Sequence, residues 1–322
     1  MSKSLVLYSN NPDDKIFAAE AAAVAHLNLE VKSDFIGVAD ALAAGEVGAV
    51  FCEIIDQAAF RKFEEAIQSR VGLFSDKVNG NHFHFLTDLD IEKTTFLLES
   101  PLFGNFVLRH YESPKADGQH YGRIVAASQT DRAFGLESIM KSKTQSVKLE
   151  WTTQKQDAVD AVRNYLLAAK FKARMATTVA NAVDEILMNA MYDAPVDDLG
   201  KSIYQSTPRS TPMKLENKAA VQMEITYDGK YVAVSAIDLY GSVDKKKLLA
   251  HMAKSYQREE FRVRATHQGA GVGLGQVFRS GGSVLFSSEA GSRTEVTIMF
   301  RRLDMFREFK DQFRFLGTQF YF

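Results

Sequence analysis

The pattern of hydrophobic and polar positions divides the chain into two halves. In the first half, short apolar runs at 5–8, 49–54 and 83–86 alternate with segments of helical periodicity. Strands that alternate with helices are typical of a parallel sheet with helices on both faces. We therefore expect residues 1–112 to form an α/β domain of this kind.

A polar stretch with Pro and Gly, at 113–120, predicts a linker to a second domain over 121–322. In that domain we expect two helices, at 155–169 and from about 174 to 192. The alternating segments predict strands at 147–151, 221–227, 231–237, 283–287 and 294–300. One mixed sheet covered by helices is the expected architecture, so the whole chain is assigned to the α/β class, with an α+β second domain.

Two further segments of the second half have a pattern of their own. The Pro-marked stretch 195–212 separates the second helix from the next strand and predicts a surface insertion. Near the C-terminus, Phe306, Phe309, Phe313 and Leu316 share one helical face, which predicts a helix. That face either packs on its own domain or forms a homodimer or partner contact.

Composition narrows the class of protein. The 322 residues include 39 basic and 40 acidic ones, a balance that gives no sign of nucleic acid or an anionic membrane as partner. The single cysteine, Cys52, lies in an apolar run and is expected to be a buried structural thiol. No apolar segment approaches the roughly 20 residues that span a bilayer. We expect a cytoplasmic protein.

The strongest candidate chemistry is on the helix from about 174 to 192. Glu185 and Asn189 are four residues apart, so they project from one face of that helix. A carboxylate and a carboxamide aimed at one point can activate a nucleophile and complete the coordination of Mg²⁺. The alternative interpretation is an ordinary solvated helix face.

Two later segments carry further candidates. Asp238 ends an alternating strand, where it either serves a site or caps the next helix. Gly269, Gly271 and Gly273 crowd one turn just before Leu274. Glycines allow close backbone approach, and the helix that follows offers free amides to phosphate, although a lone glycine-rich segment often marks only a loop.

In this order and spacing, the three segments resemble the GHKL superfamily of ATP-binding modules over about 147–300. The resemblance implies ATP and Mg²⁺ as ligands, with Glu185 as the base and Asn189 as the metal ligand. It also implies that Asp238 accepts a hydrogen bond from the adenine amino group, that Gly241 lets the backbone approach the base, and that Thr294 helps to hold adenine. Tyr240 stands where the usual pattern has another glycine. The cation-rich segment between Gly241 and Gly269 corresponds to the lid, and some of its charges are expected to screen phosphates.

Within that superfamily, the helix that carries Glu185 and the two later segments are similar to those of the bacterial anti-sigma-factor serine kinases. The helix of those kinases continues to a His-Ala pair, where this chain has Asp193-Ala194. The first half resembles a response-regulator receiver domain, but Cys52 and Glu53 stand where an Asp is expected, and no lysine is evident after the last strand. This resemblance implies a degenerate receiver-like domain used for docking or dimerisation.

We therefore expect an ATP- and Mg²⁺-binding signalling protein that phosphorylates a serine of a protein partner in bacterial regulation. Two alternatives remain open. One is a non-catalytic switch that senses nucleotide and changes partner, and the other is a scaffold that has lost nucleotide binding.

Overall fold

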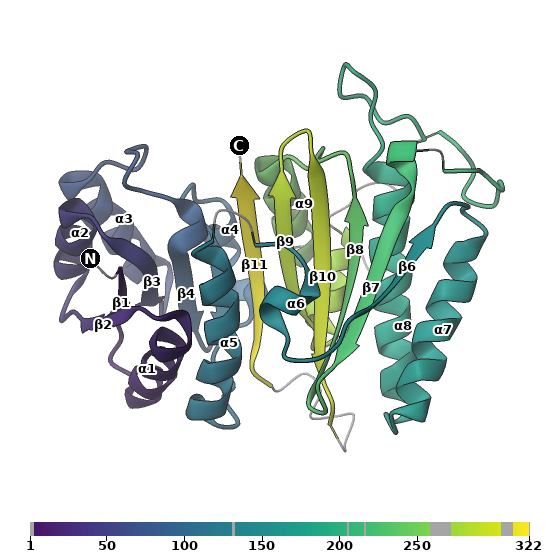
Figure 1. Ribbon diagram of the computed structural model, residues 1–322. Coiled ribbons are helices and arrows are strands. Elements are labelled where there is room, and N and C mark those ends of the chain that lie inside the picture. The colour runs from purple at the N-terminus through teal and green to yellow at the C-terminus, as the bar shows by residue number, and fades with distance from the viewer. Residues whose placement is uncertain are drawn as a thin grey trace. The chain divides into compact units, whose positions relative to one another are not determined.

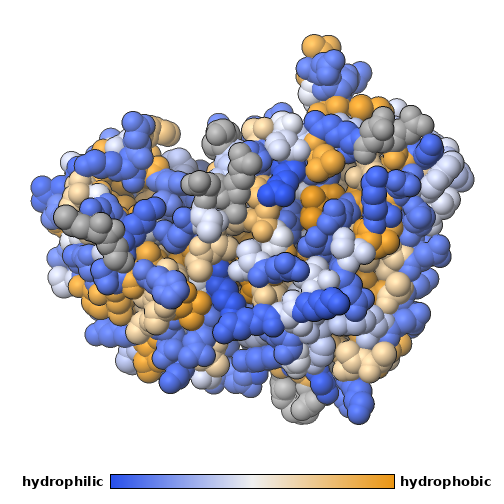
Figure 2. All heavy atoms as spheres, viewed as in Figure 1, coloured by the Kyte–Doolittle hydropathy of each residue, from blue (hydrophilic) through white to orange (hydrophobic). Residues whose placement is uncertain are grey.

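The computed structural model describes residues 3–130, 133–204, 206–215, 217–257, 272–303 and 312–321. The chain forms two compact units of mixed α/β structure, residues 1–133 with 312–319 and residues 134–311 with 320–322. Each unit is described by itself below (Figure 1). On the face shown in Figure 2, hydrophilic residues predominate and hydrophobic ones are scattered among them, as is usual for the surface of a folded protein.

The first unit contains a sheet in the order β2-β1-β3-β4-β5, followed by β11. The first five strands are parallel, and β11 pairs with β5 in the antiparallel direction. Their bounds are Ser4–Tyr8 (β1), Asn28–Val31 (β2), Val47–Glu53 (β3), Phe83–Thr87 (β4), Asn105–Leu108 (β5) and Arg314–Tyr321 (β11). The predicted parallel sheet is thus confirmed for five strands.

Helices cover both faces of this sheet. Phe51 of β3 faces Phe17 of α1, with ring centroids 5.7 Å apart. Phe85 of β4 points the other way, to Phe63 of α3 at 5.8 Å. The helices are α1 (Pro12–Ala25), α2 (Phe35–Ala44), α3 (Gln57–Arg70), α4 (Thr95–Leu98) and α5 (Pro114–Ser128). Cys52 is fully buried, and burial raises the pKa of its thiol, so the expectation of a structural cysteine is confirmed.

The linker expected over 113–120 is wrong, because this stretch begins α5. Ser113 caps the helix by accepting a hydrogen bond from the amide of Ala116, and Pro114 occupies the first turn, where its missing N–H costs nothing. Gly118 then lets α5 approach α1 closely, since a Cβ there would lie 2.5 Å from the carbonyl oxygen of Phe17. Pro114 therefore marks the start of a helix, and Gly118 marks its close contact with α1.

The predicted C-terminal helix is also wrong where the structure can test it. Phe313 directly precedes β11 and Leu316 lies within it, while Phe306 and Phe309 fall outside the described residues. β11 pairs with β5 from Arg314↔Leu108 to Gly317↔Asn105. Side chains are buried at every position from 314 to 320, so the strand has no alternation of apolar and polar residues by which to recognise it.

The second unit contains the strands β9-β10-β8-β7-β6, in that order. Their bounds are Gln145–Leu149 (β6), Val221–Tyr227 (β7), Tyr231–Asp238 (β8), Ser283–Glu289 (β9) and Arg293–Arg301 (β10). Every neighbouring pair among these five strands is antiparallel. The crossover from β8 to β9 makes those two strands parallel, but β10 lies between them.

The helices of the second unit are α6 (Leu136–Ile139), α7 (Gln154–Ala168), α8 (Ala173–Met188), α9 (Lys245–Gln257) and α10 (Val272–Arg279). α8 contacts β8 and β10, while α6 contacts β7 and β8 from the opposite face (Figure 1). A π-helical turn, η3 (Asn189–Asp193), continues α8. No helix among the described residues is long and apolar enough to cross a membrane.

Candidate functional site

Two of the predicted site residues lie side by side on neighbouring strands. Asp238 ends β8 and Thr294 is the second residue of β10, and the two are register partners in the antiparallel pair. Both are buried, with 5% of Asp238 and 1% of Thr294 exposed. The Thr294 hydroxyl also lies 3.2 Å from the hydroxyl of Ser288 on β9. Strand pairing alone therefore places these two polar groups at one edge of the sheet.

The Asp238 carboxylate is held by the turn that follows it. Its Oδ1 accepts hydrogen bonds from the amides of Tyr240 (2.9 Å) and Gly241 (3.3 Å). Burial raises its pKa to about 6, and the two amides counter that shift. Both hydrogen bonds use the same oxygen, and Asp238 also lines a cavity.

Gly241 has a structural role of its own. Its φ is +57°, and a Cβ there would lie 2.0 Å from the carbonyl oxygen of Glu289. The Gly241 carbonyl accepts a hydrogen bond from the amide of Gly291, 3.1 Å away, in the β9–β10 hairpin. Contact with this hairpin accounts for the glycine, and the cavity is lined by its neighbour Ser242 instead.

Glu185 and Asn189 lie one turn apart at the junction of α8 and η3. Asn189 is buried and lines the same cavity as Asp238 and Thr294. Glu185 is half-buried, and burial raises its pKa while the nearby charge of Arg209 opposes the shift. A π-helical turn within a helix is frequently found at a functional site.

The glycine-rich segment meets this helix at Gly273. A Cβ there would lie 1.8 Å from Cδ of Glu185, so the side chain of Glu185 packs directly on the first turn of α10. Leu274, the next residue, is buried and lines the cavity. Gly269 and Gly271 fall outside the described residues. Sequence positions 185 and 273 are therefore in contact, although 88 positions apart.

The cavity formed by these elements has a volume of about 210 Å³. Its apolar wall comes from β8, β9, β10, α8 and α10, and its polar wall from Asn189, Asp193, Asp238, Ser242, Asp244, Lys247, His251 and Thr294. Ligand pockets typically have about 300–1,000 Å³, so the cavity enclosed by the described residues is smaller than a typical ligand pocket.

Five residues of the polar wall are not among the predicted site residues: Asp193, Ser242, Asp244, Lys247 and His251. Lys247 and His251 are four apart on α9, so they share a face, and both line the cavity. Asp193, at the end of η3, lines it as well, and burial raises its pKa. The spacing of Lys247 and His251 is visible in the sequence, but the same segment contains seven other Lys, Arg and His residues, and nothing in the sequence distinguishes this pair from them.

The donor set suits a hard cation only in part. Asn189 supplies an amide oxygen of the kind that Mg²⁺ accepts. Among the described residues, no group of three or more His, Cys, Asp or Glu side chains is placed to hold a metal ion. A magnesium ion at Asn189 would complete its octahedron with phosphate oxygens and water, which is how Mg²⁺ is usually held beside nucleotides.

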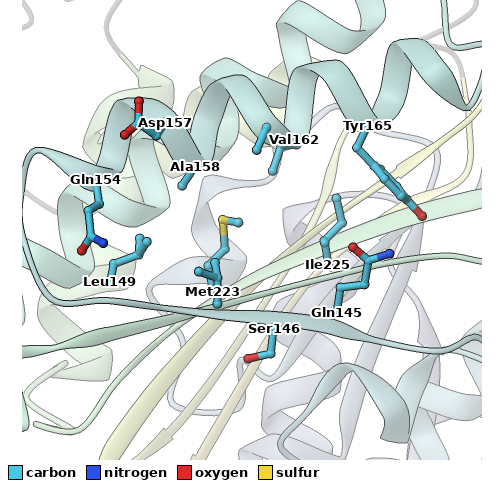
Figure 3. A pocket seen from close by; sticks show the side chains of 12 residues that line it. Gln145, Ser146, Leu149, Gln154, Asp157, Ala158, Val162, Tyr165, Met223 and Ile225 are labelled. Atoms are coloured by element: carbon cyan, nitrogen blue, oxygen red, sulfur yellow. The ribbon is translucent and has the colours of Figure 1, made fainter.

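A larger cavity, of about 370 Å³, lies between α7 and the strands β6 and β7. Figure 3 shows its apolar middle, with Val162 and Met223, and polar groups at its ends, with Gln154 and Asp157 at one and Gln145 and Tyr165 at the other. None of the predicted site residues lines it. The smaller cavity remains the candidate site because Asn189, Asp238 and Thr294 line it, whereas Glu185 lies one turn before Asn189 and does not line it.

The first unit has a polar cluster at the carboxyl ends of its parallel strands. Arg109, directly after β5, contacts Asp14 (2.8 Å), Glu53 (2.7 Å) and Asp88 (2.5 Å). Tyr111 donates a further hydrogen bond to Asp14. The cation that follows the last parallel strand, β5, is Arg109 rather than a lysine. Its guanidinium forms ion pairs with three carboxylates, so the carboxylates at this end of the sheet are already paired.

Comparison with known proteins adds no assignment to this geometry. No family model matches the chain, and a search of the curated proteins gives no match.

Proposed function

We propose that the second unit binds ATP with Mg²⁺ and transfers a phosphoryl group to a serine of a protein partner, in a bacterial signalling circuit. One observation carries the proposal. Asp238 and Thr294 are register partners at the wall of a cavity that Asn189 also lines, and Glu185 lies one turn before Asn189. These groups come from three separate segments of the sequence.

Asp238 and Thr294 form the end of the site that binds the base. The Oδ2 oxygen of Asp238, left by the two turn amides, accepts a hydrogen bond from the exocyclic amino group of adenine. Burial makes such a hydrogen bond strong, because no water competes for the acceptor. A base without an amino donor would leave this carboxylate unpaired, and selectivity for adenine follows from that cost.

Asn189 and Glu185 form the end of the site where phosphoryl transfer takes place. Asn189 gives its amide oxygen to Mg²⁺, which neutralises the charge on the phosphates when it is bound. Glu185 accepts the proton of the serine hydroxyl. Burial, which raises the pKa of Glu185, makes it a better proton acceptor than an exposed glutamate. Lys247 and His251 add positive charge to the same cavity.

A non-catalytic nucleotide switch is the second candidate, and Asp193 favours it. This carboxylate lines the cavity together with Asn189, where it repels the charge of a phosphate unless a cation neutralises it. Repulsion of this kind weakens transition-state stabilisation more than it weakens binding of the base. The two functions differ in turnover, since a kinase consumes ATP and a switch only binds it.

The first unit serves the proposed circuit as a docking or dimerisation module. A working receiver site needs free carboxylates to hold Mg²⁺, whereas Arg109 engages Asp14, Glu53 and Asp88 in this chain. Displacing the guanidinium from buried Asp14 and Glu53 would leave two uncompensated charges, a cost of several kcal/mol. The ion cluster therefore favours a module that holds its shape without phosphorylation.

The proposal is tested by calorimetric titration of the full chain with ATP and Mg²⁺. We expect binding to the native protein and loss of about tenfold or more in affinity for Asp238→Asn, since an amide can present its N–H₂ to the adenine donor. Asp157→Asn is the matched control, because Asp157 lies at the other cavity. Absence of binding to the native chain would overturn both the kinase and the switch.

Turnover then separates the two functions. For a kinase, Glu185→Gln binds ATP like the native chain and transfers phosphate at a rate lower by about two to four orders of magnitude. Binding by the native chain without any ATP consumption, in the presence of candidate partner proteins, identifies the switch.

A further inference from the structure

The segment between η3 and β7 is anchored to the candidate site and not merely attached beside it. Its first part forms a small hairpin, with Val196 bridged to Ser202. Its last part returns to η3, where the hydroxyl of Tyr192 donates a hydrogen bond to the carbonyl oxygen of Arg209 (3.1 Å). Figure 1 shows this segment projecting from the second unit before it comes back to the body.

Arg209 directs its side chain at the end of η3. Its Nη2 lies 3.9 Å from Oδ1 of Asp193, and its guanidinium carbon lies 5.7 Å from the centre of the Tyr192 ring. Side chains of both charged residues are about one-third exposed or less, 34% for Arg209 and 25% for Asp193. The guanidinium is therefore oriented by an aromatic ring and a carboxylate, both on the helix that carries the candidate catalytic residues.

The charge of Arg209 reaches both carboxylates at this end of the site. Burial raises the pKa of Glu185 and of Asp193, and in each case Arg209 is the strongest influence that lowers it again. Asp193 lines the cavity together with Asn189. The guanidinium thus lies beside Asp193, a residue that lines the cavity, without lining the cavity itself.

We propose that Arg209 binds the terminal phosphate of the nucleotide and makes the site selective for a triphosphate over a diphosphate. This inference rests on the proposed function. The geometry favours it because an N···O separation of 3.9 Å is long beside the 2.7–2.9 Å of a charge-assisted hydrogen bond. Asp193 positions the guanidinium by charge, and its donors can turn to a phosphate, for which a planar guanidinium is well suited.

Asp193 gains a role from the same arrangement. A carboxylate alone beside Asn189 would repel the terminal phosphate, whereas a carboxylate paired with Arg209 presents a neutral pair. When the guanidinium of Arg209 binds the phosphate, Asp193 remains close to the guanidinium and orients the edge that faces away from the phosphate. The insertion that follows η3 in the sequence is then part of the binding site.

The test compares the affinities for MgATP and MgADP, by calorimetry, in the full chain and in Arg209→Ala. We expect Arg209→Ala to bind MgATP about tenfold to hundredfold more weakly, the range for a hydrogen bond to a charged group, and to bind MgADP within about twofold of the native chain. Lys201→Ala is the matched control, an exposed cation of the same insertion, and it should change neither affinity. Arg209→Lys keeps the charge without the planar fork and should lose an intermediate factor for MgATP.

Each other outcome has a distinct meaning. Equal weakening of MgATP and MgADP in Arg209→Ala overturns the proposal and makes the residue an anchor of the insertion. Should Arg209→Ala fail to fold, as judged by its thermal unfolding without nucleotide, Arg209→Lys decides: an unchanged MgATP to MgADP ratio there overturns the proposal. If the native chain binds ATP and Asp238→Asn does not, while Arg209 variants keep the native ratio, the nucleotide site stands and only this inference fails. If the native chain binds neither nucleotide, both fall.

Discussion

Asp238 combines deep burial with an ionisable group. Its carboxyl is held by two backbone amides, yet burial outweighs them and raises its pKa from 3.8 to about 6. The folded protein therefore holds this proton more tightly than the unfolded chain does. The corresponding stabilisation is complete below the unfolded pKa and is lost as the pH rises through about 6.

The titration of Asp238 predicts how the stability of Asp238→Asn changes with pH. The variant carries no charge at this position, so its free energy of unfolding, relative to the native chain, should increase by about 2 kcal/mol between about pH 4.5 and about pH 7. Urea unfolding of both proteins across this range measures the difference, in which the other titrating groups cancel. A difference that stays constant with pH would contradict the shifted pKa.

At the scale of elements, the cluster around Arg109 connects the ends of several strands in the first unit. Arg109 is 4% exposed and Asp14 is fully buried, whereas the Asp88 side chain is 61% exposed. The three ion pairs of Arg109 therefore contribute unequally to the stability of the first unit. A buried carboxylate that loses its cation is costly, and an exposed one is hydrated instead.

Replacement of Arg109 by methionine should lower the free energy of unfolding by about 3–5 kcal/mol, because Asp14 and Glu53 are left buried without their cation. Asp88→Asn removes only the exposed pair and should cost about 1 kcal/mol or less. Urea unfolding followed by circular dichroism compares the two. Similar losses for both variants would show that burial does not determine the strength of this cluster.

The sequence predicts elements well where the hydrophobic period is unambiguous. The strands expected at 221–227 and 231–237 correspond to β7 and β8, and the helix that carries Glu185 is present with a π-helical end. The prediction from sequence fails for α5. Pro114 and Gly118 are residues that often mark a turn, but Pro is also common in the first turn of a helix, and Gly is also found where two helices pack closely. The prediction fails for β11 because a strand buried on both faces lacks a period of two.

The candidate site divides in the same way. The proximity of Asp238 and Thr294 follows from the antiparallel register of β8 and β10, which the family resemblance could suggest. Arg209 and the contact of Gly273 with Glu185 depend on where an irregular segment and a helix start are placed in space. Contacts of that kind arise from tertiary packing, on which periodicity carries no information.

At the scale of the whole molecule, the first unit is discontinuous in sequence. Its strand β11 comes from residues about 200 positions after β5, and Gln319 donates hydrogen bonds to the Asn81 carbonyl (3.2 Å) and to Oδ1 of Asn105 (3.4 Å). Thr318 bonds to the Gly104 carbonyl through its amide (2.8 Å) and its hydroxyl (2.9 Å). The last strand is thus integral to the polar interior of the first unit.

Gln319→Ala should therefore raise the rate of amide hydrogen exchange in β5 and around Asn81. Oδ1 of Asn105 loses its donor, at a cost of about 1–3 kcal/mol, while the Asn81 carbonyl loses one of two donors and keeps Nδ2 of Asn105. Gln222→Ala is the control, because Gln222 is an exposed residue of β7 in the second unit. Exchange measured by mass spectrometry resolves the two regions. Unchanged exchange in β5 would mean that β11 contributes little to the first unit.

The discontinuity of the first unit also fixes an order of events during synthesis on the ribosome. Strands β1 to β5 are made before the strands β6 to β10 of the second unit, and β11, which pairs with β5, is made after them. Until β11 is made, β5 presents an open edge, the kind of surface at which nascent chains pair wrongly. The yield of the first unit therefore depends on how long that edge stays open during translation.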